Sequence, residues 1–290
     1  MRTESEMLNL ILQTAKEDAR IRAVYMNGSR TNPNAMRDIF QDYDVVYVVT
    51  ETASFIADER WIDRFGARLY MQLPEKHEAH TEECWGWLVQ FADGNRLDLH
   101  VVTEKYANRE IVKDRLCRIL LDKDGLLPEM PESTDADFWV KQPTEERFLS
   151  VCNEFWWCLN NVAKGIWREE VPYVQDMVNG VIRPQLVQML SWKIGKKTNF
   201  SVSVGKSGKD MHRWLSKEEW GRFLSTYAAG SISSMKASYT EMCRLFDETA
   251  REVAGAFGFS YHAEEAKNSF AHFLHVIDLP KDAQTVYGAL

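Results

Sequence analysis

The sequence predicts an α+β protein in two parts, an N-terminal α/β domain over residues 1–135 and a helical domain over residues 136–290. Two observations support this prediction. Strand-like runs rich in β-branched residues occur in the first part, whereas hardly any alternating pattern remains in the second, which long stretches with helical periodicity fill. Between them, Pro128, Pro131 and Pro143 interrupt the chain in the manner of a linker.

The first part alternates predicted helices and strands. Leu8, Ile11, Leu12 and Ala15 recur at helical spacing and predict an opening amphipathic helix. The predicted strands are residues 21–26, 45–50, 85–91 and 96–102, and a second helix is predicted at residues 55–65. The sequence Ala-Asp-Gly-Asn between the last two strands is typical of a hairpin turn.

The second part shows helical periodicity almost throughout. Helices are predicted at residues 145–168, 173–196, 209–227, 233–257 and 261–277. Pro184 falls inside the second of them, and proline lacks the N–H group of a helix interior, so we expect it to kink a helix or to start one.

Composition limits the classes of function. The chain has 290 residues, of which 45% are hydrophobic and 27% charged, as in ordinary globular proteins. Its net charge of −8 argues against a general nucleic-acid binder and suits a cationic substrate better. Five scattered cysteines without a Cys-x-x-Cys pair favour reduced thiols and a cytoplasmic location. We expect no membrane span, since no apolar run approaches about 18 residues.

Candidate functional residues follow two of the predicted strands. Gly28 permits a tight turn after the first strand, where Ser29 and the next backbone amides can hold phosphate oxygens. Asp42 and Asp44 are two residues apart, so they share one face at the start of the next strand, and such a pair suits Mg²⁺. Asp98 lies on the polar face of the strand at residues 96–102. A carboxylate in the middle of a strand is uncommon, so Asp98 is a further candidate.

These residues resemble the nucleotidyltransferase superfamily of polymerase β-like enzymes, and within it the aminoglycoside 6-adenylyltransferases, which modify streptomycin. The resemblance rests on residues 28–32 (Gly-Ser-Arg-Thr-Asn) and 40–44 (Phe-Gln-Asp-Tyr-Asp). It continues through residues 96–99, 120–124, 138–144, 153–156, 182–184 and 215–220, and so covers nearly the whole chain. It implies a polymerase β-like domain with a mixed sheet, followed by a helical substrate-binding domain.

The resemblance also implies roles for individual residues. Asp42, Asp44 and Asp98 would bind Mg²⁺, and Asp98 is our first choice for the general base, with Glu154 on the first long helix as its rival. The nucleotide-binding candidates are Gly28, Ser29, Arg30, Lys123 and Lys206, although Lys123 could equally cap a helix. The substrate-binding candidates are Glu154, Trp167, Glu170 and Asp176, because carboxylates and indoles suit a cationic aminoglycoside.

The implied reaction moves AMP from ATP to a hydroxyl of an aminoglycoside, most simply the 6-position of streptomycin. The expected partners are ATP and the cationic drug, without nucleic acid or membrane, and the expected state is a monomer or weak dimer. Two alternatives stay open at this point. One is transfer to another small molecule, such as a lincosamide, or to a protein; the other is a nucleotide sensor without catalysis.

Overall fold

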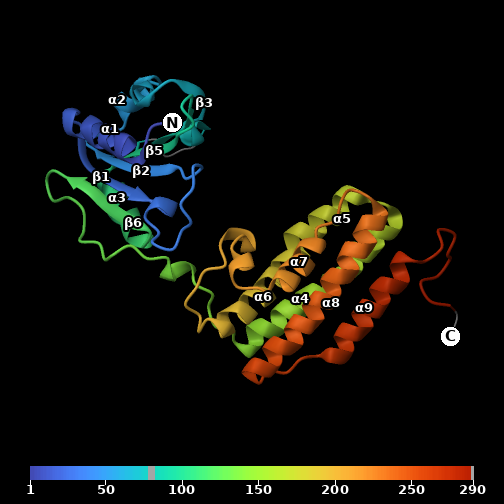
Figure 1. Cartoon of the computed structure of the whole chain (residues 1–290). Coiled ribbons are helices and arrows are strands. Elements are labelled where there is room, and N and C mark those ends of the chain that lie inside the picture. The colour runs from blue at the N-terminus through green and yellow to red at the C-terminus, as the bar shows by residue number, and fades with distance from the viewer. Residues whose placement is uncertain (78–81, 289–290) are drawn as a thin grey trace. The chain divides into compact units, whose positions relative to one another are not determined.

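The computed structural model describes residues 1–77 and 82–288 and separates into two compact units, Met1–Asp137 and Phe138–Leu290. The first unit contains a six-stranded sheet and the second is built of helices (Figure 1). The α+β class expected from the sequence is therefore confirmed. The division between the units falls two residues after residue 135, where the sequence places it.

The sheet of the first unit is mixed. Its strand order is β3-β4-β5-β2-β1-β6, in which β2 and β5 run parallel and the other neighbouring pairs run antiparallel. The strands are β1 (Ile21–Asn27), β2 (Tyr43–Val49), β3 (Arg68–Gln72), β4 (Cys84–Phe91), β5 (Arg96–Thr103) and β6 (Cys117–Asp122). The two edge strands, β3 and β6, were not expected from the sequence, because their side chains are mostly exposed or half-buried and show no clear alternation.

Helices cover both faces of this sheet. On one face, α1 (Glu4–Glu17), α2 (Ala53–Ile56) and a 3₁₀ helix at Trp61–Phe65 pack against the apolar side chains of the central strands. On the other, α3 (Glu104–Glu110) packs against a smaller apolar cluster. Alternation along β2 and β5 sends Val45 and Leu99 to the first face, and Asp44 and Asp98 to the second.

The single helix expected at residues 55–65 is interrupted. The side chain of Asp58 accepts the backbone N–H of Arg60, and the Asp58 carbonyl accepts that of Trp61. Aspartate competes in this way with helical hydrogen bonding, so the chain turns between α2 and the 3₁₀ helix.

The helical unit contains six α-helices within residues 138–288. They are α4 (Glu145–Arg168), α5 (Val171–Met177), α6 (Arg183–Lys197), α7 (Lys217–Ser225), α8 (Ile232–Phe257) and α9 (Ala263–Ile277), with a π-helical turn at Val178–Ile182 before α6. Pro184 lies in the first turn of α6, so it starts a helix. In the core, the Phe155 ring stacks on Phe246 with 3.7 Å between centroids.

One expected helix is shorter than the sequence indicates. The helix predicted at residues 209–227 begins only at Lys217, because Ser216 and Glu219 form a capping box there. The residues before it form turns and a short 3₁₀ helix at Met211–Arg213.

Two further expectations concern the environment of the chain. All five cysteines are free and buried, and burial raises the pKa of Cys152 to about 12, so its thiol is protonated at neutral pH. Within the described part of the chain, we find no helix with the length and apolar character that crossing a membrane requires.

Candidate active site

Three carboxylates meet where the central parallel strands of the first unit begin. The register of β2 and β5 pairs Asp44 with Asp98, and Asp42 immediately precedes β2. One ligand atom from each of the three lies within 4.8 Å of the other two. Face alternation placed Asp98 on the polar face of its strand, and the family resemblance implied the grouping. The parallel register of β2 and β5 supplies the structural reason for it.

The turn after β1 packs directly against this cluster. Gly28 has φ +75°, and a Cβ built on it would lie 2.1 Å from the Asp44 Oδ2 atom. A cavity of about 330 Å³ opens here, and its lining includes Asn27, Gly28, Asp44, Asp98 and His100. Glycine is therefore required for two reasons, its left-handed backbone and the closeness of the carboxylate.

The cluster is electrostatically strained. Burial, reinforced by the neighbouring charges of Asp42 and Asp98, raises the pKa of Asp44 to about 7. Arg96 offsets part of this charge by donating to both oxygens of Asp98, at 2.9 and 2.6 Å, and its Nε lies 3.7 Å from Asp42 Oδ2. A cation bound by the three carboxylates would, like Arg96, lower the raised pKa of Asp44.

The donor set fits a hard divalent ion. Carboxylate oxygens are the protein ligands that Mg²⁺ prefers, and it commonly uses only a few of them together with water and substrate phosphates. Beside the carboxylates, the buried Asn27 Oδ1 atom has no hydrogen-bond partner among the described residues. Asn27 thus offers a neutral oxygen to a ligand in the same cavity.

Gly28, Ser29 and Arg30 form one 3₁₀ turn rather than the start of a longer helix. Ser29 is half-buried, and its carbonyl accepts a hydrogen bond from the Gln41 side chain. Arg30 is 8% exposed, donates to the backbone carbonyls of Gln41 and Asp42, and stacks on the Tyr43 ring at 3.7 Å. The Arg30 guanidinium therefore holds the segment that carries Asp42, and its expected phosphate-binding role stays a prediction.

The Lys123 side chain also donates to backbone carbonyls away from the carboxylate cluster. Its Nζ donates to the carbonyl oxygens of Ala15 and Asp18 at the end of α1, at 2.7 and 3.3 Å. Lys123 directly follows Asp122, which pairs with Ala23 near the start of β1. The turn at Gly28 follows the other end of β1. Lys123 thus caps a helix, one of the two roles the sequence allowed, and it is not part of the carboxylate cluster.

The remaining candidates belong to the helical unit and are dispersed. Lys206 is exposed in the loop between α6 and α7, and Glu154 is exposed on α4 with its Oε1 atom 3.6 Å from Cys158 Sγ. The aromatic residues that follow Glu154 in the sequence suggest partial burial, but Glu154 faces solvent. Phe155 and Trp156 turn inward, whereas Trp157 is exposed like Glu154. Glu170 and Asp176 are exposed at α5.

Trp167 has structural contacts. Its indole N–H donates to the Leu279 carbonyl at 3.0 Å, and Lys281 Nζ lies over its ring at 5.4 Å. The helical unit has a cavity larger than the one beside Gly28, and the tryptophans that line it are Trp156 and Trp157, not Trp167.

Three residues of the smaller cavity, Asn27, His100 and Asp114, were not expected to form part of the site. A signal for Asn27 exists in the sequence, since it is a polar residue that ends an apolar strand just before the Gly28 turn. Asp114 lies in a loop and gives no comparable signal.

Comparison with known proteins identifies the family. The model of the streptomycin adenylyltransferase family matches residues 1–276. The chain belongs to this family. It is 38% identical over 271 residues to the aminoglycoside 6-adenylyltransferase of Campylobacter jejuni, which covers 93% of this chain and 94% of that protein. The aminoglycoside 6-adenylyltransferase of Bacillus subtilis is 37% identical over 265 residues, which cover 90% of this chain and 93% of that protein.

Two further relatives of this adenylyltransferase family are similar over most of their length. The aminoglycoside 6-adenylyltransferase of Staphylococcus aureus is 34% identical over 265 residues, covering 90% and 94% of the two chains. A crystal structure of an aminoglycoside 6-adenyltransferase from Bacillus subtilis is 31% identical and covers 96% of this chain and all of that one, with a TM-score of 0.48. Family membership confirms the expected enzyme class, an adenylyltransferase.

Proposed function

We propose that this protein transfers AMP from ATP to a hydroxyl of an aminoglycoside, the 6-position of streptomycin, and releases pyrophosphate. The observation that carries the proposal is the grouping of Asp42, Asp44 and Asp98 within 4.8 Å beside the Gly28 turn, in a chain of this family. The names of the relatives support an aminoglycoside acceptor. Adenylylation of the drug would inactivate it, which gives the protein a role in antibiotic resistance.

The three carboxylates would hold Mg²⁺, which when bound would neutralise negative charge that develops on the transferred phosphate. The backbone amides after Gly28 and the Ser29 hydroxyl would hold the β- and γ-phosphates. Lys206, exposed on its loop, is the further cation that we assign to the triphosphate.

Asp98 would act as the general base. As the acceptor oxygen bonds to the α-phosphorus, its proton passes to a carboxylate oxygen of Asp98, and the bond from the α-phosphorus to the β-phosphate oxygen breaks. Arg96 must then release one Asp98 oxygen, and its side chain is 46% exposed, so it has room to move. Glu154 is the second candidate for the base. Glu170 and Asp176, both exposed, are proposed contacts for the cationic groups of the acceptor.

The test is mass spectrometry of streptomycin after incubation with the purified protein, ATP and Mg²⁺. We expect an AMP adduct with the wild type, and Asp98→Asn should slow its formation by about 10²–10⁴-fold. Asp124→Asn is the matched control. Arg22 donates to both carboxylate oxygens of Asp124, each at 2.6 Å, as Arg96 donates to those of Asp98, but this pair lies at the end of β1 away from the Gly28 turn. Asp124→Asn should retain the wild-type rate.

Other outcomes would redirect the assignment. An adduct that forms at near-normal rate with Asp98→Asn, and is lost with Glu154→Gln, would make Glu154 the base. No adduct with the wild type, with ATP intact, would refute streptomycin as the acceptor.

A further inference from the structure

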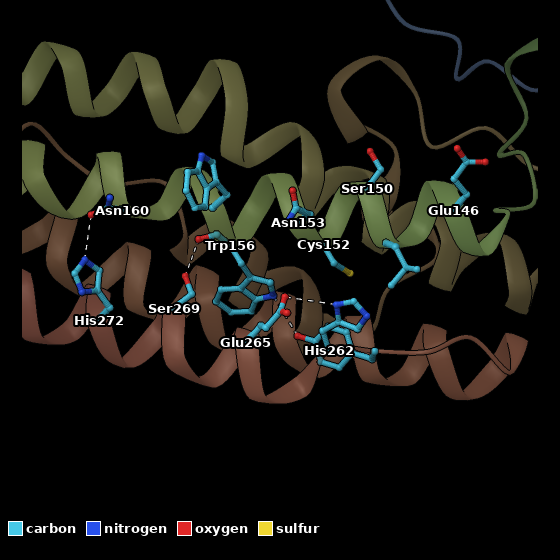
Figure 2. Close-up of a pocket in the computed structure, with 13 residues that line it drawn as sticks. Glu146, Ser150, Cys152, Asn153, Trp156, Asn160, His262, Glu265, Ser269 and His272 are labelled. Carbon is cyan, nitrogen blue, oxygen red and sulfur yellow. Dashed lines mark hydrogen bonds and ion pairs between the residues drawn. The ribbon is translucent and has the colours of Figure 1, made fainter.

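A groove between α4 and α9 of the helical unit forms a cavity with a volume of about 680 Å³ (Figure 2). Cavities of roughly 300–1,000 Å³ are typical of binding sites for small organic molecules. Glu146 and Asn160 mark the two ends of its lining on α4, about 21 Å apart at a rise of 1.5 Å per residue. The groove is therefore long enough for a molecule with more than one ring.

Two adjacent indoles line the groove in different ways. Trp156 is buried and fixed, since its indole N–H donates to the Tyr261 hydroxyl at 3.3 Å, and that hydroxyl donates to Asp247 at 2.7 Å. Trp157, by contrast, is 76% exposed. An indole left in water beside a cavity offers a large flat surface to a ligand.

Apart from its two histidines, the charged side chains that line the groove are carboxylates. Glu146 and Glu265 contribute carboxylates, and no lysine or arginine is among the described residues of its lining. Glu265 is 76% exposed and lies beside His262, with 3.5 Å between Oε2 and Nδ1. Carboxylates beside exposed indole faces form the environment in which organic cations bind.

At the far end of the groove, the C-terminal segment contacts the lining residue His272. His272 Nε2 contacts Asn160 Oδ1 at 3.1 Å, and its Nδ1 contacts the Tyr287 hydroxyl at 2.6 Å. Figure 2 shows His272 and Asn160 facing each other across α9 and α4, away from Glu265 and His262. The Ser269 hydroxyl, which donates to the Trp156 carbonyl at 2.6 Å, ties the two helices together between these points.

We propose that the α4–α9 groove binds a ring-bearing organic cation, with the ring against Trp157 and its guanidinium or ammonium group beside Glu265. Ser269 contacts the carbonyl of Trp156, so Trp157 and Glu265 lie about two helical turns or less apart along the pair. The cation has two possible sources, the acceptor of adenylyl transfer or another cationic metabolite or drug.

The first test is calorimetric titration without ATP, using streptomycin and benzamidine as cationic probes and benzamide as the uncharged counterpart of benzamidine. We expect at least one cation to bind and benzamide not to bind. Trp157→Ala should weaken binding of that cation about 5–30-fold, and Glu265→Gln about 3–10-fold. Tyr70→Ala, which removes a ring that is 70% exposed in the other unit, and Glu218→Gln on α7 are the matched controls and should change the dissociation constant less than 2-fold.

Steady-state transfer kinetics then distinguish the two sources, and this arm alone rests on the proposed function. A rise in KM for streptomycin in Trp157→Ala at unchanged kcat identifies the acceptor as the bound cation. An unchanged KM, with binding of the other probe lost, identifies a different cation. Because the titration needs no ATP, cation binding that depends on Trp157 stands even if the wild type transfers no AMP.

Failure of the cation titration would overturn the inference. Such a failure is either equal affinity of the wild type and Trp157→Ala for every cation that binds, or no binding of either cation. A wild-type dimer in sedimentation analysis that Trp157→Ala converts to monomer, while no cation binds, would then assign the groove to a second copy of the chain.

Discussion

Replacing Gly28 by alanine tests how closely the turn and the carboxylate cluster depend on each other. The added Cβ would lie 2.1 Å from Asp44 Oδ2 and 2.9 Å from its Cγ, so the carboxyl group must move by about 1 Å to reach an ordinary contact distance. A shift of that size in a group that positions reactants can lower the rate by about 10²-fold. The backbone at φ +75° adds a cost of roughly 1–2 kcal/mol to folding.

Gly125→Ala separates these two effects. Gly125 has φ +68°, close to that of Gly28, but nothing lies within 4 Å of the Cβ that would be added. Backbone strain should therefore cost both variants roughly 1–2 kcal/mol of unfolding free energy, while only Gly28→Ala should lose activity.

The assays are thermal unfolding and the steady-state rate of pyrophosphate release with ATP, Mg²⁺ and streptomycin. The reasoning is refuted if Gly28→Ala keeps wild-type kcat/KM, or if Gly125→Ala loses as much activity as Gly28→Ala does. An equal loss would mean that backbone strain, and not the closeness of Asp44, controls the rate.

Three further predictions concern stability. Lys123→Met should cost about 0.5–2 kcal/mol of unfolding free energy by uncapping α1 but leave kcat unchanged, and a large fall in kcat would restore its assignment to the nucleotide. Phe155→Ala should cost about 3–5 kcal/mol in denaturant unfolding by removing the ring stacked on Phe246, and a cost below about 1 kcal/mol would contradict the packing. The Lys193 ammonium lowers the pKa of Glu219 to about 2. The contribution of this ion pair to the free energy of unfolding is therefore complete above pH 4.5 and is lost as pH falls toward 2. Glu219→Gln should accordingly cost on the order of 1–2 kcal/mol at pH 7 and progressively less toward pH 3, and a cost independent of pH would exclude the ion pair as its cause.

The sequence was most informative where a pattern is local. Alternation along residues 96–102 placed Asp98 on the polar face, and helical periodicity located α4, α8 and α9 to within two residues. The Gly-Ser turn and the Asp-x-Asp pair were visible for the same reason, since each depends only on residues close together in the chain.

Contacts distant in the chain were not predictable in this way. Arg30 has the sequence context of a phosphate-binding cation, and only the fold brings the carbonyls of Gln41 and Asp42 to its guanidinium. Lys123 likewise meets the end of α1 because β6 pairs with β1. Glu154 was misjudged because aromatic sequence neighbours do not bury a residue whose own side chain points outward.

The sequence by itself indicated the fold class through composition and periodicity, and its motifs, through their resemblance to a known family, indicated the family and the three carboxylates. The tertiary structure decided which cations are free to act and where an indole is left exposed. It decided them because the pairing of strands and the packing of helices bring together side chains that are far apart in the chain. Thus Asp98 is held by Arg96 beside Asp44, and Trp157 faces a groove completed by a helix about 110 residues later.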